Sequence, residues 1–419
     1  MTEIRPFKGI IYNTSKVKGE DVVAPPYDII TPEMKDSLYE KSPYNIVRID
    51  YGRDYDNDTP EGENRYVRAR QYLKEWLEED ILVESKKPSY YLYRVRYRVD
   101  DKEQVMTGVF ARVRLTELCE GIYPHEATHS KPKADRLNLM RYCRANISPI
   151  FSIFNNPEHS YRSLIEKKSS EDPYISAYDH TGARHELWII DDPVEIDLIT
   201  GIIRGRPIYI ADGHHRYETA LEYMKERKRA NPHHTGDEPY NYVLMLLVNI
   251  SDGGLCILPT HRLVKSLGPV IQSGESILHR LREYFEVKPL KSDEDLFKEL
   301  PFYEHALGMI LKNPPQSYIL IHRGINLRDT PEALRGLDVT VLHELIFKKI
   351  FSIDGLAYEM DPHIVINEVR KGDYIAGFFL NPTKVTEVER VAIECLRMPP
   401  KSTYFYPKIL TGLVINRLD

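Results

Sequence analysis

The sequence has no long apolar run, no excess of positive charge and no closely spaced pair of cysteines. Its longest apolar run extends from Tyr242 to Val248, far short of the roughly 20 residues that a membrane-spanning helix needs. We expect a buried strand there instead. The residues that follow Met1 also lack the apolar core of a signal peptide. These features predict a cytoplasmic protein without a membrane partner.

Acidic residues outnumber basic ones, with 63 Asp and Glu against 57 Lys and Arg and a formal net charge of −6. Proteins that bind nucleic acid favour a positive surface, so we expect no nucleic-acid partner. The four cysteines are spread along the chain without a C-x-x-C pair. They are expected to be reduced residues of the core rather than zinc ligands.

The chain of 419 residues, 42% of them hydrophobic, has the size of two or three globular domains. Strand-like and helix-like patterns alternate along it, which predicts an α/β or α+β fold. We place a boundary near residue 266, between regions 1–265 and 266–419. One expected helix begins at Pro32, and the other clear ones cover residues 63–79, 196–204, 215–229 and 342–351. The clearest expected strands cover residues 90–98, 104–115, 147–154, 186–191, 207–211, 242–250 and 255–259.

The most informative segment reads I-Y-I-A-D-G-H-H-R-Y, from Ile208 to Tyr217. A short buried strand is expected to end at Ala211 and a helix to begin near His215, with Gly213 permitting the tight turn between them. The first N–H groups of a helix have no partner within the helix and carry a partial positive charge. This spacing therefore predicts a turn that binds an anion.

Charged side chains in the same turn suit a phosphate or pyrophosphate group. The expected phosphate-binding residues are Gly213, His214, His215 and Arg216. Asp212 is expected to hold Mg²⁺ or to orient a hydroxyl group, since carboxylate oxygens are the ligands that Mg²⁺ prefers. The alternative interpretation is that Asp212 and His214 only cap the helix.

A second segment, from Tyr123 to Arg136, begins with a match to the zinc-hydrolase pattern H-E-x-x-H at His125 to His129. That pattern works only on a helix, and the flanking prolines leave room for barely two helical turns. A loop that presents Glu126 as a base is the better-supported interpretation. After it come Lys131 and Lys133, which are expected to bind phosphate, and Arg136. Together they form either an anion-facing cluster or a solvated charged surface.

Other candidate residues lie outside these two segments. Near the C-terminal end, Lys401, Ser402 and Thr403 suit phosphate oxygens, although no glycine-rich loop precedes them, so this is not a Walker sequence. A surface interpretation is equally open for this group. Asp28 follows the rigid pair Pro25–Pro26, and Arg144 and Asn146 precede an expected strand.

Four segments in this order resemble the family called domain of unknown function 1015. They are A-P-P-Y-D at residues 24–28, H-E-x-T followed by P-K-x-D-R at 125–136, A-D-G-H-H-R-Y-E-T-A at 211–220, and K-S-T-Y-F-Y-P-K at 401–408. The D-G-H-H-R element is also similar to the phosphate-binding turn of the ParB/sulfiredoxin superfamily. That superfamily includes free-serine kinases, which use ADP, ATP or, in one branch, pyrophosphate.

The resemblance implies a ParB/sulfiredoxin-like core with large insertions in region 1–265, and a C-terminal α/β region, 266–419, that closes the cleft. It implies a kinase that phosphorylates free L-serine to O-phosphoserine. Chains of this size resemble the pyrophosphate-using branch, so pyrophosphate is the expected donor, with ATP or ADP as alternatives. Mg²⁺ is the implied cofactor.

The resemblance also implies roles for the candidate residues. Asp212 and the three residues 214–216 would match the phosphate-and-metal turn. Glu126 is the expected catalytic base, with His125 beside it and Asp28 in reserve. Free serine needs a cation for its carboxylate, expected from Arg136 or Arg144, and an acceptor for its ammonium, expected from Asp28. Asn146 completes the expected substrate-binding set.

Two alternatives from other functional classes are open. The first is a ParB-like, nucleotide-dependent module that binds nucleic acid. Such a module needs a basic recognition helix, whereas the helix after His215 carries Glu218, Glu222 and Glu226. The second alternative is a zinc hydrolase that uses His125 and His129.

Overall fold

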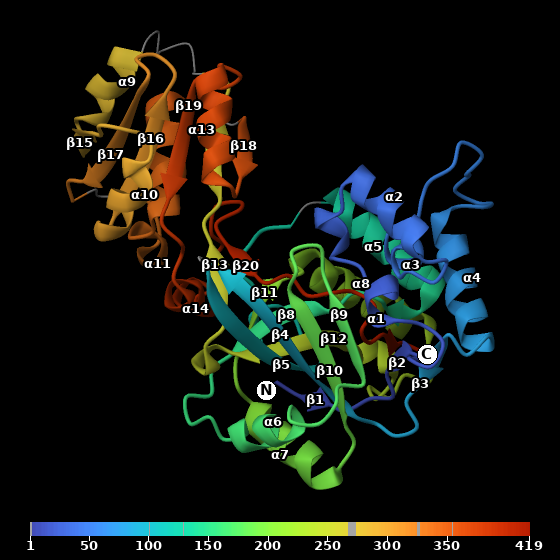
Figure 1. Ribbon diagram of the computed structural model, residues 1–419. Helices are drawn as coiled ribbons and strands as arrows, with labels where there is room; N and C mark the ends of the chain where they lie inside the picture. The colour runs from blue at the N-terminus through green and yellow to red at the C-terminus, as the bar shows by residue number, and fades with distance from the viewer. Residues whose placement is uncertain (1, 100, 129, 267–273, 325–326, 354) are drawn as a thin grey trace. The chain divides into compact units, whose positions relative to one another are not determined.

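The computed structural model describes residues 2–99, 101–128, 130–266, 274–324, 327–353 and 355–419. The chain forms two compact units (Figure 1). Unit 1 comprises Met1–Pro124, Thr128–Leu255 and Pro407–Asp419, and unit 2 comprises His125–Ala127 and Cys256–Tyr406. The catalytic and cleft-closing roles expected of regions 1–265 and 266–419 stay predictions.

Unit 1 is built on one mixed sheet, which confirms the predicted α/β class. Its strands lie in the order β6 (Ile122–Tyr123), β11 (Ile208–Asp212), β8 (Ile150–Phe154), β12 (Tyr242–Asn249), β5 (Lys102–Arg114), β4 (Tyr90–Val99), β10 (Arg184–Ile190) and β9 (Ile175–Tyr178), and β1 (Ile4–Arg5) pairs with β5. Strand β12 lies between β8 and β5 and is buried along its whole length. The continuous apolar run in the sequence predicted this buried position.

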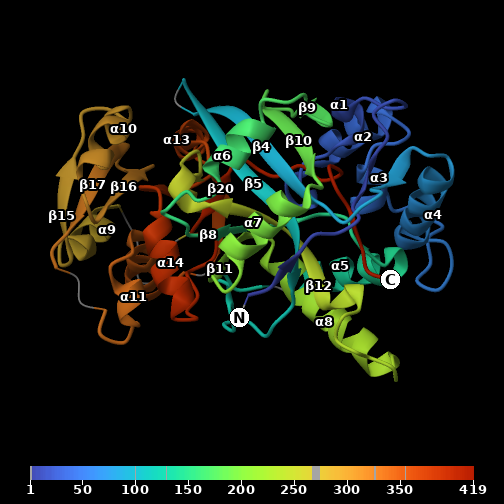
Figure 2. The ribbon, with the colours of Figure 1, turned by 90° about the horizontal axis from the view of Figure 1, so that it is seen from below.

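The helices of unit 1 are α1 (Gly19–Val22), α2 (Pro32–Lys41), α3 (Val47–Asp50), α4 (Arg65–Glu78), α5 (Ser130–Cys143), α6 (Arg162–Lys168), α7 (Pro193–Ile203) and α8 (His214–Ala230). Two small antiparallel pairs complete it: β2 (Ile10–Tyr12) with β3 (Leu82–Glu84), and β7 (Ala145–Asn146) with β21 (Asn416–Arg417). Figures 1 and 2 show α2 to α5 grouped at one end of the unit, away from α6 and α7.

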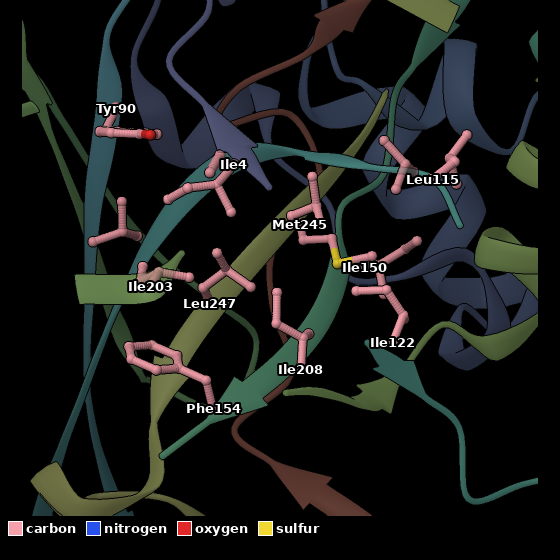
Figure 3. Close-up of a cluster of buried hydrophobic side chains, with 14 of the residues drawn as sticks. Ile4, Tyr90, Leu115, Ile122, Ile150, Phe154, Ile203, Ile208, Met245 and Leu247 are labelled. Atoms are coloured by element: carbon pink, nitrogen blue, oxygen red, sulfur yellow. The ribbon is translucent and has the colours of Figure 1, made fainter. Parts of the chain in front are cut away.

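The core of unit 1 fills the space between the sheet and its helices. Ile150, Ile208, Met245 and Leu247 point from neighbouring strands into one cluster (Figure 3). Residues of α5 to α8 join the same cluster, among them Ile203. Burying a side chain of this size stabilises a fold by about 1.5–3 kcal/mol. Because Ile208 of β11 and Tyr217 of α8 belong to this cluster, the core holds the two elements against each other.

The predicted start of α2 is confirmed in detail. Thr31 occupies the N-cap position and its side chain accepts a hydrogen bond of 3.2 Å from the backbone N–H of Met34. Pro32 is the first helical residue, where its missing N–H costs nothing. Glu126 lies outside any helix, as predicted. In contrast, α5 runs for 14 residues, although the prolines were expected to leave room for barely two helical turns. Pro132 lies within the first turn of α5, the only part of a helix that tolerates proline well.

Unit 2 has a second sheet with strands in the order β15 (Phe285–Pro289), β17 (Gln316–His322), β16 (Ala306–Leu311), β19 (Ala376–Leu380), β14 (His261–Val264) and β18 (Leu356–Glu359). Its helices are α9 (Gly274–Leu281), α10 (Asp295–Glu299), α11 (Glu332–Arg335), α12 (Asp338–Thr340), the π-helix η5 (Val341–Phe351), α13 (Pro362–Lys371) and α14 (Val385–Ile393). Strands β13 (Cys256–Leu258) and β20 (Tyr404–Tyr406) form a separate pair.

Both faces of the unit 2 sheet are covered. Neighbouring residues of a strand point to opposite faces. Phe379 packs in a cluster with Val365 of α13, whereas the ring of Phe378 lies 5.3 Å from that of Phe347 in η5. This confirms the predicted α/β character of the C-terminal region.

Two further predictions concern the whole chain. No helix in the described part of the chain has the length and apolar character needed to span a bilayer. Cys143 and Cys256 form no disulfide bond, as predicted. Cys119 and Cys395 are disulfide-bonded, so the expectation that all four cysteines are reduced is wrong.

The hairpin between β9 and β10 depends on a buried carboxylate. Oδ1 of Asp179 accepts hydrogen bonds from the backbone N–H groups of Thr181 (2.8 Å) and Ala183 (2.9 Å). Its Oδ2 lies 3.3 Å from Nε2 of the fully buried His185. Burial alone would raise the pKa of Asp179, but these partners lower it to about 2.

The ionised carboxylate of Asp179 therefore stabilises unit 1 at neutral pH. An unfolded Asp has a pKa near 3.9, so this contribution is complete above about pH 5 and is lost as the pH falls towards 2. We expect Asp179→Asn to lower the free energy of unfolding by on the order of 2 kcal/mol at pH 6, because the amide keeps the oxygen acceptor but removes the charge. The difference should shrink steadily between pH 5 and pH 3.

Urea unfolding followed by tryptophan fluorescence measures this effect in unit 1. Both tryptophans of the chain, Trp76 and Trp188, belong to that unit. The matched control is Asp172→Asn, at an exposed carboxylate of the same unit, which should change little at any pH. A constant loss in Asp179→Asn from pH 6 to pH 3 would mean that the charge plays no part.

Candidate functional site

The turn between β11 and α8 has the geometry that the sequence predicted. The pairing of β11 with β8 shifts register between Ile210 and Asp212, and such a bulge re-aims the side chain that follows it. Gly213 then adopts a φ of +96°, in the left-handed region. A Cβ at this position would lie 2.8 Å from Nε of Arg216. Backbone conformation and space therefore both require glycine here.

Helix α8 begins directly after this glycine and runs for 17 residues, from His214 to Ala230. Its N-cap residue is Gly213, which has no side chain with which to cap the helix. Within the first turn, His214 is buried and His215 is half-buried. The partial positive charge of the helix N-terminus lies beside these imidazoles. An anion is the kind of ligand that this end of a helix favours.

An ion cluster lies at the same turn. Arg216 places its NH2 group 3.2 Å from Oδ2 of Asp212 and donates a second hydrogen bond, from NH1, to the carbonyl oxygen of Pro149. Lys408 places Nζ 3.6 Å from the same Oδ2. Two cations therefore converge on one carboxylate. Sequence reasoning quoted Lys408 within its motif but assigned it no role, because only the folded chain brings it to Asp212.

The predicted substrate residue Arg136 is committed to a buried network. Its NH1 group donates a hydrogen bond of 3.0 Å to Oδ1 of Asp50, and its Nε donates one of 2.7 Å to Oδ2 of Asp135. The guanidinium carbon also lies 4.0 Å from the ring centre of Tyr27. Burial would lower the pKa of Arg136, but the two carboxylates raise it. Arg136 is therefore charged and already neutralised by protein groups.

A small cavity connects this network to the β11–α8 turn. It has a volume of about 30 Å³, and Asp50, Arg136, Ser148 and Arg216 contribute to its lining. Ser148 donates a hydrogen bond of 2.6 Å to Oδ1 of Asp50, whereas Oδ2 of Asp50 has no hydrogen-bond partner. A space of this size holds about one water molecule. Sequence reasoning missed Asp50, which carries no motif of its own.

Tyr27 and the predicted residue Asp28 lie next to this network. Burial raises the pKa of Tyr27 to about 12, against the opposing effect of the nearby Arg216 and Arg136. Asp28 follows in the same short 3₁₀ turn (Tyr27–Ile29) and is exposed. The structure therefore brings Asp28, Arg136 and Arg216 into one neighbourhood of unit 1.

The other two predicted substrate residues have different surroundings. Oδ1 of Asn146 accepts hydrogen bonds from the backbone N–H of Leu244 (3.1 Å) and from Asn416 (2.9 Å). It thus holds β7, β12 and β21 together. Arg144 contributes to a different cavity, of about 470 Å³, whose other basic lining residues are Arg70, Lys74, Arg141 and Arg417. The structure therefore does not bring Arg144 to the β11–α8 turn.

The predicted basic cluster lies on α5. Nζ of Lys133 is 3.0 Å from Oε2 of Glu218, and the hydroxyl of Thr128 donates a hydrogen bond of 2.7 Å to the same oxygen. This ion pair joins α5 to α8. Lys131 belongs to α5, but its side chain and the whole of His129 lie outside the described residues.

The remaining predicted residues lie in unit 2, in two segments that meet there. Nε2 of the fully buried His125 lies 2.8 Å from the hydroxyl of Thr403. Oε1 of Glu126 accepts a 3.3 Å hydrogen bond from the backbone N–H of Lys401. The hydroxyl of Ser402 donates a hydrogen bond of 2.6 Å to the carbonyl oxygen of Pro399. The structure thus brings the predicted base together with the predicted group at residues 401–403.

The zinc-hydrolase alternative needs a helix through its H-E-x-x-H pattern, so that both histidines share one face. His125 lies outside any helix, and α5 begins only at Ser130. The pattern therefore lacks the backbone on which its chemistry depends.

Comparisons with known proteins give one family and several distant likenesses. Residues 4–340 match the family described as protein of unknown function (DUF1015). No match was found among curated proteins. The chain is similar to a conserved hypothetical protein from Pyrococcus furiosus, with 14% identity, a TM-score of 0.34, and 72% of this chain and 92% of that chain covered.

Two further solved structures are comparably distant. One is a free serine kinase in complex with AMP, with 14% identity, a TM-score of 0.34, and 73% of this chain and 92% of that chain covered. The other is SbnI with a C-terminal truncation from Staphylococcus aureus, with 11% identity, a TM-score of 0.36, and coverages of 72% and 85%. Likenesses this weak carry no argument about what the chain binds or does.

Proposed function

This chain belongs to the DUF1015 family, and we propose that it phosphorylates the hydroxyl group of free L-serine to give O-phosphoserine. Pyrophosphate is the proposed donor, with ATP or ADP as alternatives. The observation that carries the proposal is the β11–α8 turn, where Asp212, Arg216 and Lys408 meet beside the N-terminus of a long helix. Its D-G-H-H-R sequence is the element that resembles the phosphate-binding turn of the ParB/sulfiredoxin superfamily, which includes free-serine kinases.

The proposed reaction is a direct transfer of one phosphoryl group. The serine oxygen forms a bond to phosphorus, the bond from that phosphorus to the bridging oxygen breaks, and phosphate leaves. The negative charge of the transferring group is spread over its oxygens. The helix N-terminus, Arg216 and Lys408 would stabilise this charge, because they are fixed in place before the reaction.

The serine hydroxyl must lose its proton as it attacks, and Glu126 is the proposed base. Its Oε1 accepts a hydrogen bond from the N–H of Lys401, which holds the carboxylate in one orientation. Thr403 holds His125 in the same way. We assign His125 the role of positioning the segment that carries Glu126.

Serine recognition is proposed for the neighbourhood of Tyr27. Asp28 presents an exposed carboxylate there, which suits the serine ammonium group. Arg136 is occupied by Asp50 and Asp135, so its proposed role is to hold Tyr27 and Asp28 in position rather than to bind the substrate carboxylate.

Mg²⁺ is the proposed cofactor, and Asp212 would hold it together with oxygens of the donor. Mg²⁺ commonly binds through one or two carboxylates plus substrate phosphates, and the Asp212 carboxylate is partly exposed, at 23% of its side-chain surface. When bound, the ion would neutralise charge on the transferring phosphoryl group.

Product analysis tests the proposed function directly. We expect purified protein, L-serine, Mg²⁺ and pyrophosphate to give O-phosphoserine and phosphate in equal amounts, measured by ³¹P NMR and mass spectrometry. Parallel reactions with ATP and with ADP identify the donor, and omission of serine controls for simple hydrolysis. If all three donors give only phosphate, or no turnover, a serine kinase is the wrong assignment.

A further inference from the structure

Two histidines of unit 2 face each other at one end of a strand pair. His305 precedes β16 and His322 ends β17, and the two strands pair antiparallel with Ala306 opposite Ile321. The backbone N–H of His322 donates a hydrogen bond of 3.1 Å to the carbonyl oxygen of His305. Their rings stack with centres 5.9 Å apart. This arrangement sets two imidazole nitrogens side by side.

A carboxylate from another part of the chain completes the group. Asp338, the first residue of α12, has its Oδ1 3.7 Å from Nδ1 of His305 and 3.9 Å from Nε2 of His322. One nitrogen or oxygen atom from each of the three residues lies within 4.8 Å of the others. Three side chains from separate segments therefore point to one position.

Two of the three polar groups at this position are largely buried, and their facing atoms are not hydrogen-bonded. The side chains of His322 and Asp338 are only 11% and 18% exposed. Nε2 of His322 and Oδ1 of Asp338 both lack a hydrogen-bond partner. Buried polar groups are rarely left in this state, so each such group needs an explanation. His305 also adopts a φ of +56°, which is uncommon for a residue other than glycine and occurs often at functional sites.

A catalytic His–Asp pair would not explain these atoms, because separations of 3.7 and 3.9 Å are too long for hydrogen bonds. A metal ion explains them better. Bonds of about 2.1 Å to zinc place two ligand atoms of a tetrahedral site about 3.4 Å apart. The two separations from Asp338, 3.7 and 3.9 Å, need only a small contraction to reach this spacing.

We propose that His305, His322 and Asp338 bind Zn²⁺ or a similar divalent transition metal ion. Two imidazoles and one carboxylate suit this class of metal, whereas Mg²⁺ and Ca²⁺ prefer oxygen ligands alone. The proposal does not depend on the serine kinase assignment.

The site opens on a pocket of unit 2. His305 and Asp338 line a cavity of about 520 Å³, together with Lys384 and Glu387. Three protein ligands leave a fourth coordination position for water or a small ligand, as in catalytic rather than structural zinc sites. A small ligand that enters this cavity would therefore reach the metal directly.

Calorimetric titration of the full chain with ZnCl₂, after removal of bound metal by EDTA and dialysis, tests the site. We expect one equivalent to bind, and His322→Ala to weaken the affinity by more than about 100-fold. His305→Ala should have a similar effect, and because this side chain is 57% exposed, its loss should leave the fold intact. The control His279→Ala, at an exposed histidine of α9, should bind zinc as the natural chain does.

Two further measurements complete the test. The visible absorption of bound Co²⁺ should show the intense bands of a four-coordinate ion, and MgCl₂ should give no binding heat that depends on His305. The proposal is wrong if the chain binds no zinc, or if zinc affinity is unchanged in both His305→Ala and His322→Ala. If zinc binding is lost only in His125→Ala, the metal binds at the H-E-x-x-H segment and not at the proposed site.

Discussion

Replacing Arg136 with methionine is expected to lower the free energy of unfolding of unit 1 by about 3–5 kcal/mol. The side chain is 6% exposed and neutralises Asp50, which is 3% exposed. Without the guanidinium, Asp50 would keep only the hydrogen bond from Ser148, since its Oδ2 has no partner. A buried carboxylate left without its cation costs far more than the ion pair contributes. Tyr27 would also lose the cation over its ring.

Urea unfolding followed by tryptophan fluorescence measures this loss, because Trp76 and Trp188 both report on unit 1. The double variant Arg136→Met with Asp50→Asn should recover a large part of the stability, since it removes the stranded charge. A double variant as unstable as Arg136→Met would show that packing, rather than charge, causes the loss.

The matched control is Arg162→Met. Arg162 forms an ion pair of 3.0 Å with Glu166 on the surface of α6, and both side chains are mostly exposed. Exposed pairs of this kind contribute about 0.2–1 kcal/mol or less. A control that loses as much stability as Arg136→Met would contradict the argument from burial.

Local sequence patterns predicted the parts of the fold that neighbouring residues decide. The turn from β11 to α8 was predictable because an apolar strand, a glycine and a helical pattern follow one another within a few residues. The buried strand β12 was predictable from a continuous apolar run, and the N-cap of α2 was predictable from Thr31 followed by Pro32. Helix α5 was not, because Pro132 was interpreted as a helix breaker, although a proline in the first turn is tolerated.

The candidate site was only partly predictable, because several of its members come from distant segments. Asp212, Gly213 and Arg216 share one short motif, whereas Lys408 and Asp50 meet them only after the chain has folded. Nothing in the spacing of these last two residues indicates their position. The three proposed metal ligands of unit 2 show the same difficulty, since they lie on three separate elements.

Charge alone also misled the assignment of roles. Arg136 was expected to bind the substrate carboxylate, and Lys133 a phosphate. The structure gives Arg136 two carboxylate partners and pairs Lys133 with Glu218. Acids that pair with these two cations therefore reduce the charge that each can offer to a ligand. Asp50 and Glu218 lie on other elements than the cations they pair with, and sequence patterns do not place them, whereas Asp135 is the sequence neighbour of Arg136.

Arg216 lies at the β11–α8 turn, where it and Lys408 both contact the carboxylate of Asp212. Its replacement should have the largest effect on activity. We expect Arg216→Ala to reduce phosphoserine formation by about 10²–10³-fold, because one fixed cation is removed from the transferring group. The variant should also lose about 1–3 kcal/mol of stability, since the buried carbonyl of Pro149 loses its donor. The fold of this variant must therefore be checked by circular dichroism and tryptophan fluorescence.

A second variant separates loss of fold from loss of function. Arg216→Lys keeps the charge, but an ammonium group lacks the planar fork that donates hydrogen bonds to Pro149 and Asp212 at the same time. We therefore expect weaker pyrophosphate binding, with a smaller loss of stability than in Arg216→Ala. The matched control is Arg229→Ala, at an exposed arginine in the last turn of the same helix. Pyrophosphate affinity, measured by calorimetry, should fall in both Arg216 variants and stay unchanged in Arg229→Ala. If a folded Arg216→Ala variant binds pyrophosphate and turns over serine like the natural chain, the donor phosphate does not bind at the β11–α8 turn.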